Sequence, residues 1–259
     1  MLAERFEHRA SDAPPRPPLS VPNPMDATRR VRGVLFDLDG TLYRQRPMRA
    51  LMAAELGMLA ISRPLRAPVI WRVLSEFRKA QESLRATPSN RQAADQIDVA
   101  ARRTGMPVDQ VEAIVAEWMI ARPLKHLPHC RAEGLVPLLD FLSRIGVKLG
   151  VLSDYPADLK LKALGIGGRF SVVLSATDPE VGRFKPDPRG FLAAAARWQL
   201  DPSEVLVVGD RPDADAAGAA AAGMPCVIVG NRHHQSSRDF VSLQSLERLR
   251  DVLDDDHSR

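Results

Sequence analysis

The stretch that decides the fold lies at residues 34–41 and reads Val-Leu-Phe-Asp-Leu-Asp-Gly-Thr. Its three leading apolar residues predict a short buried strand, and Gly40 predicts a sharp turn directly after it. The acidic pair Asp37 and Asp39 therefore stands where this strand ends. In open parallel sheets ligands bind beyond the carboxyl ends of the strands, so we expect chemistry at these two carboxylates if the sheet is parallel.

The second half of the chain predicts that sheet. After Glu133, short apolar runs alternate with helix-like stretches, which is typical of an α/β fold. The runs are apolar throughout rather than at every second residue, which indicates strands covered on both faces, as in a parallel sheet. The predicted strands lie at residues 34–36, 147–152, 172–174, 205–208 and 226–229. Helices are expected between them at residues 135–144, 157–164, 188–198 and 213–222.

Residues 47–130 have a different character. Their apolar residues recur at helical spacing, with breaks at proline and glycine, and predict about four helices. We expect a helical bundle inserted after the first strand, which leaves residues 31–46 and 131–259 for the sheet domain. Residues 1–30 contain six prolines among polar residues and predict a flexible, extended arm.

Composition narrows the function classes. With 45% hydrophobic and 26% charged residues, the chain is an ordinary globular protein. The cysteines, Cys130 and Cys226, are far apart and favour a reducing compartment over a disulfide framework. No apolar run is long enough to span a bilayer, so we expect a cytoplasmic protein without membrane contact. The charge of +4 is scattered and aromatic residues make up 5%, which favours small anions over nucleic acid as partners.

Further polar residues follow the other predicted strands. Ser153 follows the second strand, Lys185 lies in a loop between prolines, and Asp210 and Asp215 follow the fourth strand. Each has an ordinary structural explanation: a helix cap for Ser153 and the acids, and a solvated surface position for Lys185. Their shared placement at strand ends favours a common site over these separate explanations.

These residue types suit phosphoryl transfer. One carboxylate of the Asp37 and Asp39 pair can attack phosphorus. The other, with a pKa raised by its acidic neighbours, can protonate the leaving oxygen and later activate water. Lys185 would offset the repulsion between an anionic nucleophile and an anionic phosphate. Asp210 and Asp215 beside the first pair would form a site of hard oxygen ligands for Mg²⁺.

The motifs Asp37–Leu42, Ser153, Lys185 and Gly209–Asp215 resemble those of the haloacid dehalogenase superfamily, over residues 31–230. The likeness is to its phosphatase-like branch, with a helical cap inserted after the first motif. It implies a Rossmann-like core, a helical-bundle cap at residues 47–130, Asp37 as nucleophile and Asp39 as general acid and base. It further implies phosphate binding by Thr41, Ser153, Asp154 and Lys185. Mg²⁺ would be held by Asp37, the Asp39 carbonyl and Asp210, with Asp215 in support and Asp213 as its competitor.

The expected function is a Mg²⁺-dependent phosphohydrolase that cleaves a small phosphorylated metabolite through an aspartyl-phosphate on Asp37. Dehalogenases that resemble this motif lack the second aspartate, so Asp39 favours phosphoryl transfer. A phosphomutase uses the same groups and remains an alternative, as does a non-enzymatic phospho-acceptor or binding protein. The sequence indicates neither the substrate nor whether the protein is a monomer or a homodimer.

Overall fold

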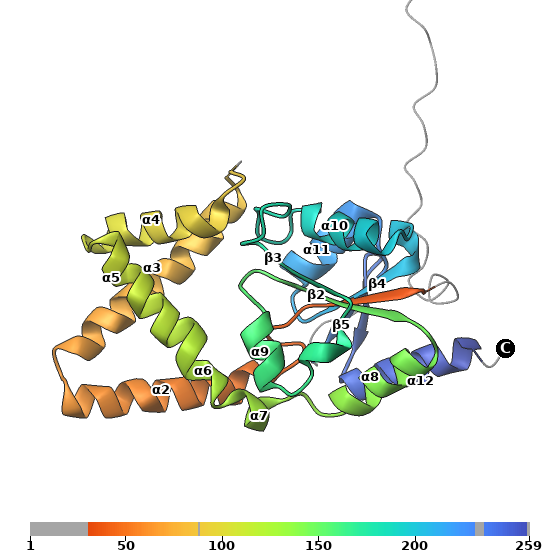
Figure 1. Cartoon of the computed structure of the whole chain (residues 1–259), viewed down its shortest axis with the longest axis horizontal. Helices are drawn as coiled ribbons and strands as arrows, with labels where there is room; N and C mark the ends of the chain where they lie inside the picture. Colours follow the sequence, from red (N-terminus) through yellow and green to blue (C-terminus); the bar gives the residue numbers. More distant parts are fainter. Residues whose placement is uncertain (1–30, 88, 231–235, 258–259) are drawn as a thin grey trace, which may run out of the picture.

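The structure, a computed structural model, describes residues 31–87, 89–230 and 236–257. Within them six parallel strands form one sheet in the order β3-β2-β1-β4-β5-β6 (Figure 1). The strands are β1 (Gly33–Phe36), β2 (Lys148–Ser153), β3 (Val172–Ser175), β4 (Val205–Gly209), β5 (Cys226–Val229) and β6 (Val241–Leu243). The predicted α/β class with a Rossmann-like parallel sheet is confirmed. The predicted proline-rich arm at residues 1–30 lies outside the described residues.

The strand order brings distant motifs together. β1 pairs with β2 on one side and with β4 on the other, and Phe36 is in register with Val151 and Val208. The residues that follow these three strands therefore emerge side by side at one edge of the sheet. This edge carries Asp37 and Asp210, which follow β1 and β4, and Ser153, the last residue of β2.

Helices cover both faces of the sheet (Figure 1). On one face lie α8 (Leu135–Arg144), α9 (Asp158–Ala163) and α12 (Leu246–His257), and on the other α10 (Arg189–Trp198) and α11 (Ala217–Ala222). Each face has its own apolar core, because side chains of one strand point alternately to the two faces. The sequence predicted about five strands. The sixth, β6, and the helix α12 were not predicted.

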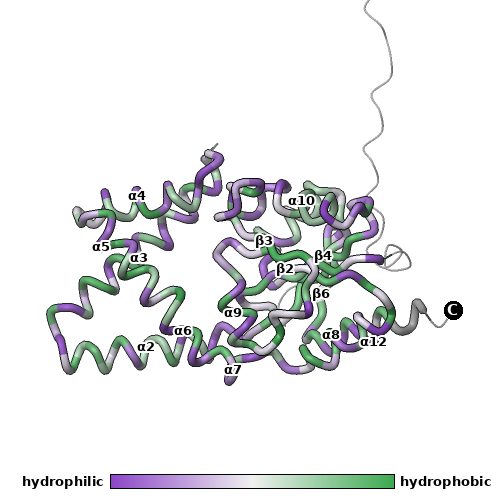
Figure 2. Tube along the Cα trace, in the orientation of Figure 1, coloured by the Kyte–Doolittle hydropathy of each residue, from purple (hydrophilic) through white to green (hydrophobic). Residues whose placement is uncertain are grey.

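The helical segment between β1 and β2 lies beside the sheet domain (Figure 1). It contains α2 (Gln45–Ser62), α3 (Arg66–Arg85), α4 (Gln92–Thr104), α5 (Val108–Val115), η2 (Ala116–Ala121), α6 (Arg122–Leu124) and α7 (Leu127–Cys130). Hydrophobic and hydrophilic residues alternate along these helices, whereas β3 and β4 are mostly hydrophobic (Figure 2). The buried stripe forms a small core around Val73, Phe77 and Val111. The expected helical insert is thus present, and its division at residues 47 and 130 stays a prediction.

The two ends of this insert meet. Tyr43 and Arg131 form an antiparallel bridge. Beside it the Arg44 N–H donates to the Cys130 carbonyl at 2.8 Å, and the Ala132 N–H donates to the Leu42 carbonyl at 3.1 Å. The chain therefore leaves the sheet domain and returns to it at one place.

Two smaller expectations concern the cysteines and the membrane. Cys130 and Cys226 are both free and buried, as expected. In the described part of the chain, no helix is both long enough and apolar enough to cross a bilayer.

Candidate active site

Three carboxylates meet at the sheet edge. One oxygen each of Asp37, Asp210 and Asp215 lies within 4.8 Å of the other two. Two glycines allow this approach. A Cβ on Gly40, whose φ is +118°, would lie 2.1 Å from an Asp210 oxygen, and a Cβ on Gly209 would lie 2.3 Å from an Asp215 oxygen. Any side chain at either position would push a carboxylate out of the cluster.

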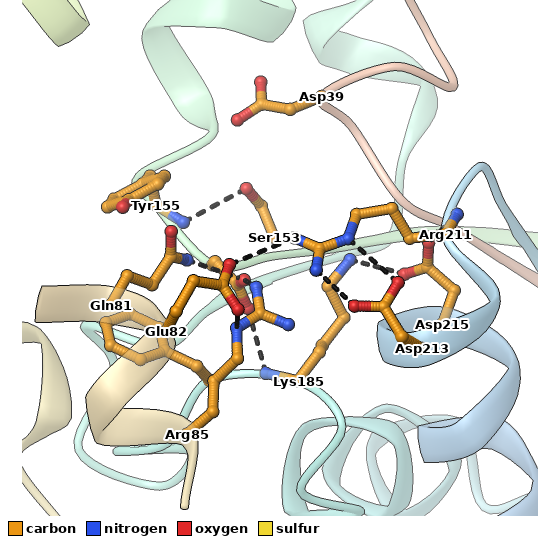
Figure 3. A network of polar contacts seen from close by, with 12 residues as sticks. Asp39, Gln81, Glu82, Arg85, Ser153, Tyr155, Lys185, Arg211, Asp213 and Asp215 are labelled. Carbon is orange, nitrogen blue, oxygen red and sulfur yellow. Dashed lines mark hydrogen bonds and ion pairs between the residues drawn. The ribbon is translucent and has the colours of Figure 1, made fainter. Parts of the chain in front are cut away.

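Lys185 is the cation of this cluster. Its ammonium group donates to Asp37 Oδ1 and, at 2.7 Å, to Asp215 Oδ1, and the residue is only 6% exposed. Figure 3 shows the Lys185 side chain directed toward Asp215. Asp215 Oδ2 accepts the N–H groups of Asp210 and Arg211 at 3.2 and 3.0 Å. Asp213, by contrast, is exposed and pairs with Arg211. Of the two candidate acids in this loop, the structure places Asp215 in the cluster and Asp213 outside it.

The three carboxylates of the cluster carry more negative charge than the single ammonium group of Lys185 can balance. Burial, against the opposing effect of Lys185, raises the pKa of Asp37 to about 6. Burial followed by the charge of Asp37 raises the pKa of Asp210 to about 7. Asp37 Oδ2 is buried without a hydrogen-bond partner among the described residues. Three converging carboxylates with an unpaired oxygen are a donor set that fits a hard divalent cation such as Mg²⁺.

Asp39 has different neighbours. Lys160 donates to both of its carboxylate oxygens at 2.6 and 2.8 Å, and the Tyr43 hydroxyl donates to Oδ1 at 2.7 Å. Burial alone would raise the pKa of Asp39, but Lys160 and Tyr43 more than offset it and hold the pKa below its ordinary value. The raised pKa expected from acidic neighbours is therefore wrong for Asp39.

Lys160 was not predicted, although the sequence around it carries a signal. Lys160 is 5% exposed and lies on α9 in the apolar stripe of Ala157, Leu161 and Leu164. A lysine in such a stripe is rarely buried unless it has an acidic partner. Its position thus indicated a buried carboxylate nearby.

The predicted phosphate-binding residues have different surroundings. Ser153 is buried and its Oγ accepts the Tyr155 N–H at 3.2 Å. Asp154 Oδ1 accepts the Lys185 N–H at 2.9 Å, and its Oδ2 accepts hydrogen bonds from Gln81 and Arg85. Both oxygens of Asp154 therefore already have protein donors. The Thr41 hydroxyl is buried without a hydrogen-bond partner in the described part of the chain.

A cavity of about 760 Å³ lies between the insert and the sheet edge. The sheet domain lines it with Asp37, Asp39, Ser153, Lys185 and Asp210, among others; Thr41 does not line it. The insert contributes α3, whose Gln81 and Arg85 bind Asp154 at 2.9 and 2.8 Å (Figure 3). Gln81 was not predicted. The roles of Thr41 and Asp154 in phosphate binding stay predictions.

Comparison with known proteins agrees with this arrangement. Residues 31–223 match the haloacid dehalogenase-like hydrolase family. The chain is 31% identical over 234 residues to glyceraldehyde 3-phosphate phosphatase of Methanopyrus kandleri, covering 86% of this chain and 96% of that protein.

Two solved structures have the same fold. A HAD phosphatase from Thermococcus onnurineus is 26% identical, with a TM-score of 0.60, over 86% of this chain and 98% of its own. A 2-haloacid dehalogenase from Pseudomonas syringae is also 26% identical, with a TM-score of 0.58, over 87% and 99%. The family match spans most of the chain and includes every clustered carboxylate. The protein is therefore a member of the haloacid dehalogenase-like hydrolase family.

Proposed function

We propose that the protein is a Mg²⁺-dependent phosphatase that transfers the phosphoryl group of a small phosphorylated metabolite to Asp37. The observation that carries this proposal is the buried Lys185 ammonium between Asp37 and Asp215, on a cavity that also exposes Asp39. The similarity to a phosphatase of Methanopyrus kandleri supports it. We further infer a cytoplasmic location, which the two free, buried cysteines support.

In the first step an Asp37 oxygen forms a bond to phosphorus while the bond from phosphorus to the ester oxygen breaks. Lys185 lowers the repulsion between the attacking carboxylate and the phosphate. Ser153, which lines the same cavity, would donate its hydroxyl hydrogen to a phosphoryl oxygen. In the second step a water oxygen attacks the same phosphorus, the bond to Asp37 breaks and inorganic phosphate leaves.

Asp39 would handle the protons of both steps. It gives a proton to the leaving ester oxygen and later takes one from the attacking water. Its lowered pKa keeps Asp39 ionised and so able to accept a proton, but it also makes the carboxylate a weaker base. For the first role Asp39 must bind a proton, and an arriving phosphate dianion favours this because nearby negative charge raises the pKa of an acid.

The metal site would use the carboxylate cluster. Asp37, Asp210 and the Asp39 carbonyl would hold Mg²⁺, and Asp215 would support them. When bound, the ion neutralises part of the phosphate charge and polarises a phosphoryl oxygen. Gln45, which donates to the Asp39 carbonyl, would keep that oxygen in place.

The similar structure from Pseudomonas syringae is named a 2-haloacid dehalogenase. In this protein Asp39 favours phosphatase activity over dehalogenation. Attack on carbon with loss of a halide needs no proton donor for the leaving group. Here Lys160 and Tyr43 both hold the Asp39 carboxylate at the cavity wall. An acid held in this way has a use in cleaving an ester and none in releasing a halide.

The test is phosphate release from p-nitrophenyl phosphate with and without Mg²⁺. Asp37→Asn should lower the rate at least about 1,000-fold, because it removes the nucleophile while keeping the shape of the side chain. Asp213→Asn is the matched control, since it changes an exposed acid of the neighbouring loop in the same way. Equal turnover by the two variants would exclude Asp37 as the nucleophile.

A further inference from the structure

Exposed apolar side chains gather at the outer end of the insert. There α2 ends at Ser62 and α3 begins at Arg66, and Figure 1 shows this junction at the far left, away from the sheet domain. We call residues 58–72 the insert tip. Its apolar side chains are 72%, 86%, 87% and 63% exposed at Met58, Ile61, Leu65 and Trp71. Elsewhere in the described part of the chain, no large apolar side chain is more than 56% exposed.

The fold of the insert does not account for these side chains. α2 and α3 are held together by a separate small core of Ile70, Leu74 and Trp118, with Met52 and Leu56 packed against it. Apolar side chains that remain in water are unfavourable, and a group of them at one place on a surface marks a site of interaction. The insert tip therefore has the character of a binding surface.

The insert tip is also basic. No acidic residue occurs between Glu55 and Glu76, whereas Arg63, Arg66 and Arg72 all lie there and are exposed. Within the residues that the structure describes, none of these three arginines forms an ion pair. The acids on either side, Glu55 and Glu76, already have basic partners within the insert. The insert tip thus offers apolar and positive groups and no negative one.

This combination distinguishes between possible partners. Pairing of the insert tip with the same surface of a second copy would bring two sets of arginines together, without an acid in the segment to offset their repulsion. An anionic lipid surface attracts the arginines and accepts the apolar side chains at its acyl boundary. Because the insert tip lies at one end of the molecule, it can reach such a surface while the sheet domain stays outside (Figure 1).

We propose that the insert tip binds the surface of an anionic phospholipid membrane. Ile61 and Leu65 enter the acyl boundary, and Arg63 and Arg66 contact the headgroup phosphates. Trp71, in the second turn of α3, lies at the headgroup level, where tryptophan is common in membrane proteins. The sequence led us to expect no membrane contact because it contains no spanning segment. A peripheral contact of this kind needs no such segment.

The test is co-sedimentation of the full chain with vesicles of phosphatidylcholine, either alone or mixed with phosphatidylglycerol. The anionic vesicles should bind at least about 10-fold more tightly, as several basic side chains near a charged surface predict. Tryptophan emission reports the contact, because Trp71 is 63% exposed whereas Trp118 and Trp198 are 3% and 4% exposed. Binding should therefore shift the emission to shorter wavelength.

Two changes at the insert tip separate its apolar and charged contributions. Leu65→Ser should weaken binding to anionic vesicles about 5-fold or more, because it removes apolar area from the contact. Leu192→Ser is the matched control, since it changes an exposed leucine of α10 on the sheet domain. Arg63→Gln combined with Arg66→Gln should lower the preference for anionic vesicles about 10-fold. Its control is Arg102→Gln, which changes an exposed arginine of α4.

Equal binding to neutral and anionic vesicles would overturn the inference, as would binding that survives in the variants of the insert tip. Sedimentation equilibrium without lipid covers the other occupant: a dimer that Leu65→Ser dissociates would overturn the inference in favour of a second copy. Leu65→Ser should release phosphate from p-nitrophenyl phosphate at the rate of the wild type, which confirms that the variant is folded. Vesicle binding does not depend on turnover, so its outcome is separate from that of the proposed function.

Discussion

At the scale of single residues, the site depends on charges that the chain itself does not balance. Lys185 supplies one positive charge to Asp37, Asp210 and Asp215, and all three carboxylates share a volume with little access to water. Desolvated carboxylates of this kind resist ionisation, which the pKa values of about 6 for Asp37 and about 7 for Asp210 express. Folding therefore works against ionisation of Asp37 and Asp210 unless a cation joins them.

This imbalance predicts a pH dependence of metal-linked stability. Both folded pKa values lie above the ordinary 3.8, so in metal-free protein these groups reduce stability progressively as the pH rises from about 4 to about 7. Mg²⁺ binds the ionised carboxylates and should therefore restore stability most at the upper end of this pH range. Urea unfolding with Mg²⁺ or with a chelator should show a stabilisation at least about 1 kcal/mol larger at pH 8 than at pH 5. A stabilisation equal at both pH values would contradict this account.

The residues that sequence could identify share one property. Asp37, Ser153 and Asp210 each follow an apolar run. The end of a predicted strand therefore located each of them without any information on the tertiary structure. Lys160 and Gln81, which were not predicted, sit on helices instead. Which way a helix points its side chains into a site depends on how it packs, and packing is set by contacts far away in the chain. Of these helical residues, only Lys160 is recognisable from the local sequence, because it is a lysine in an apolar stripe.

At the scale of elements, Glu55 joins two parts of the insert. Its carboxylate on α2 pairs with Arg122 at 2.9 Å, with Lys125 at 2.7 Å and with His126. Burial acts to raise the pKa of Glu55, but hydrogen bonds from these three residues outweigh it and lower the pKa to about 2. One side chain thus ties α2 to the segment that leads back to the sheet.

Glu55→Gln tests this junction. The depressed pKa stabilises the fold above the ordinary value of 4.5, and this stability is lost as the pH falls toward about 2. The variant should be less stable than the wild type by about 1 to 3 kcal/mol at pH 7. Urea unfolding should show the difference shrinking between pH 5 and pH 3. A difference that does not change with pH would mean that shape, rather than charge, matters at this position.

Periodicity located most elements. The predicted strand at residues 226–229 matches β5, and the predicted helix at residues 135–144 matches α8. β6 was missed because it has three residues, all half-buried, which leaves too short a pattern to recognise. α12 did carry a helical stripe, since Leu246, Leu249 and Leu253 are buried on one side. Leucines at this spacing are typical of a helix with one buried face.

At the scale of the whole molecule, Gln92 links the insert to the loop that carries Lys185. Its amide nitrogen donates to the carbonyls of Leu84 and Thr87 at 2.6 and 2.9 Å, and its amide oxygen accepts the Phe184 N–H at 2.7 Å. The side chain is almost fully buried. It therefore satisfies three main-chain groups that water reaches poorly.

Gln92→Leu should weaken this link. Three main-chain groups would lose their partner, which we expect to lower the free energy of unfolding by about 2 to 4 kcal/mol. Phosphate release should fall as well, because Phe184 precedes Lys185 in the chain. Urea unfolding and a phosphatase assay check both effects, with exposed Gln110→Leu as the control. Unchanged stability in Gln92→Leu would show that the insert and the loop are held together elsewhere.

The bridge between Tyr43 and Arg131 has a consequence for the evolution of proteins with this fold. The two ends of the whole intervening segment lie next to each other, as the two ends of a tight turn do. The pairing of the strands therefore does not depend on the length of this segment. Segments of other lengths and shapes can be exchanged at this junction while the strand order stays the same. The clustered carboxylates lie in the chain on either side of this segment, so the strand ends that carry them keep their order when the segment changes.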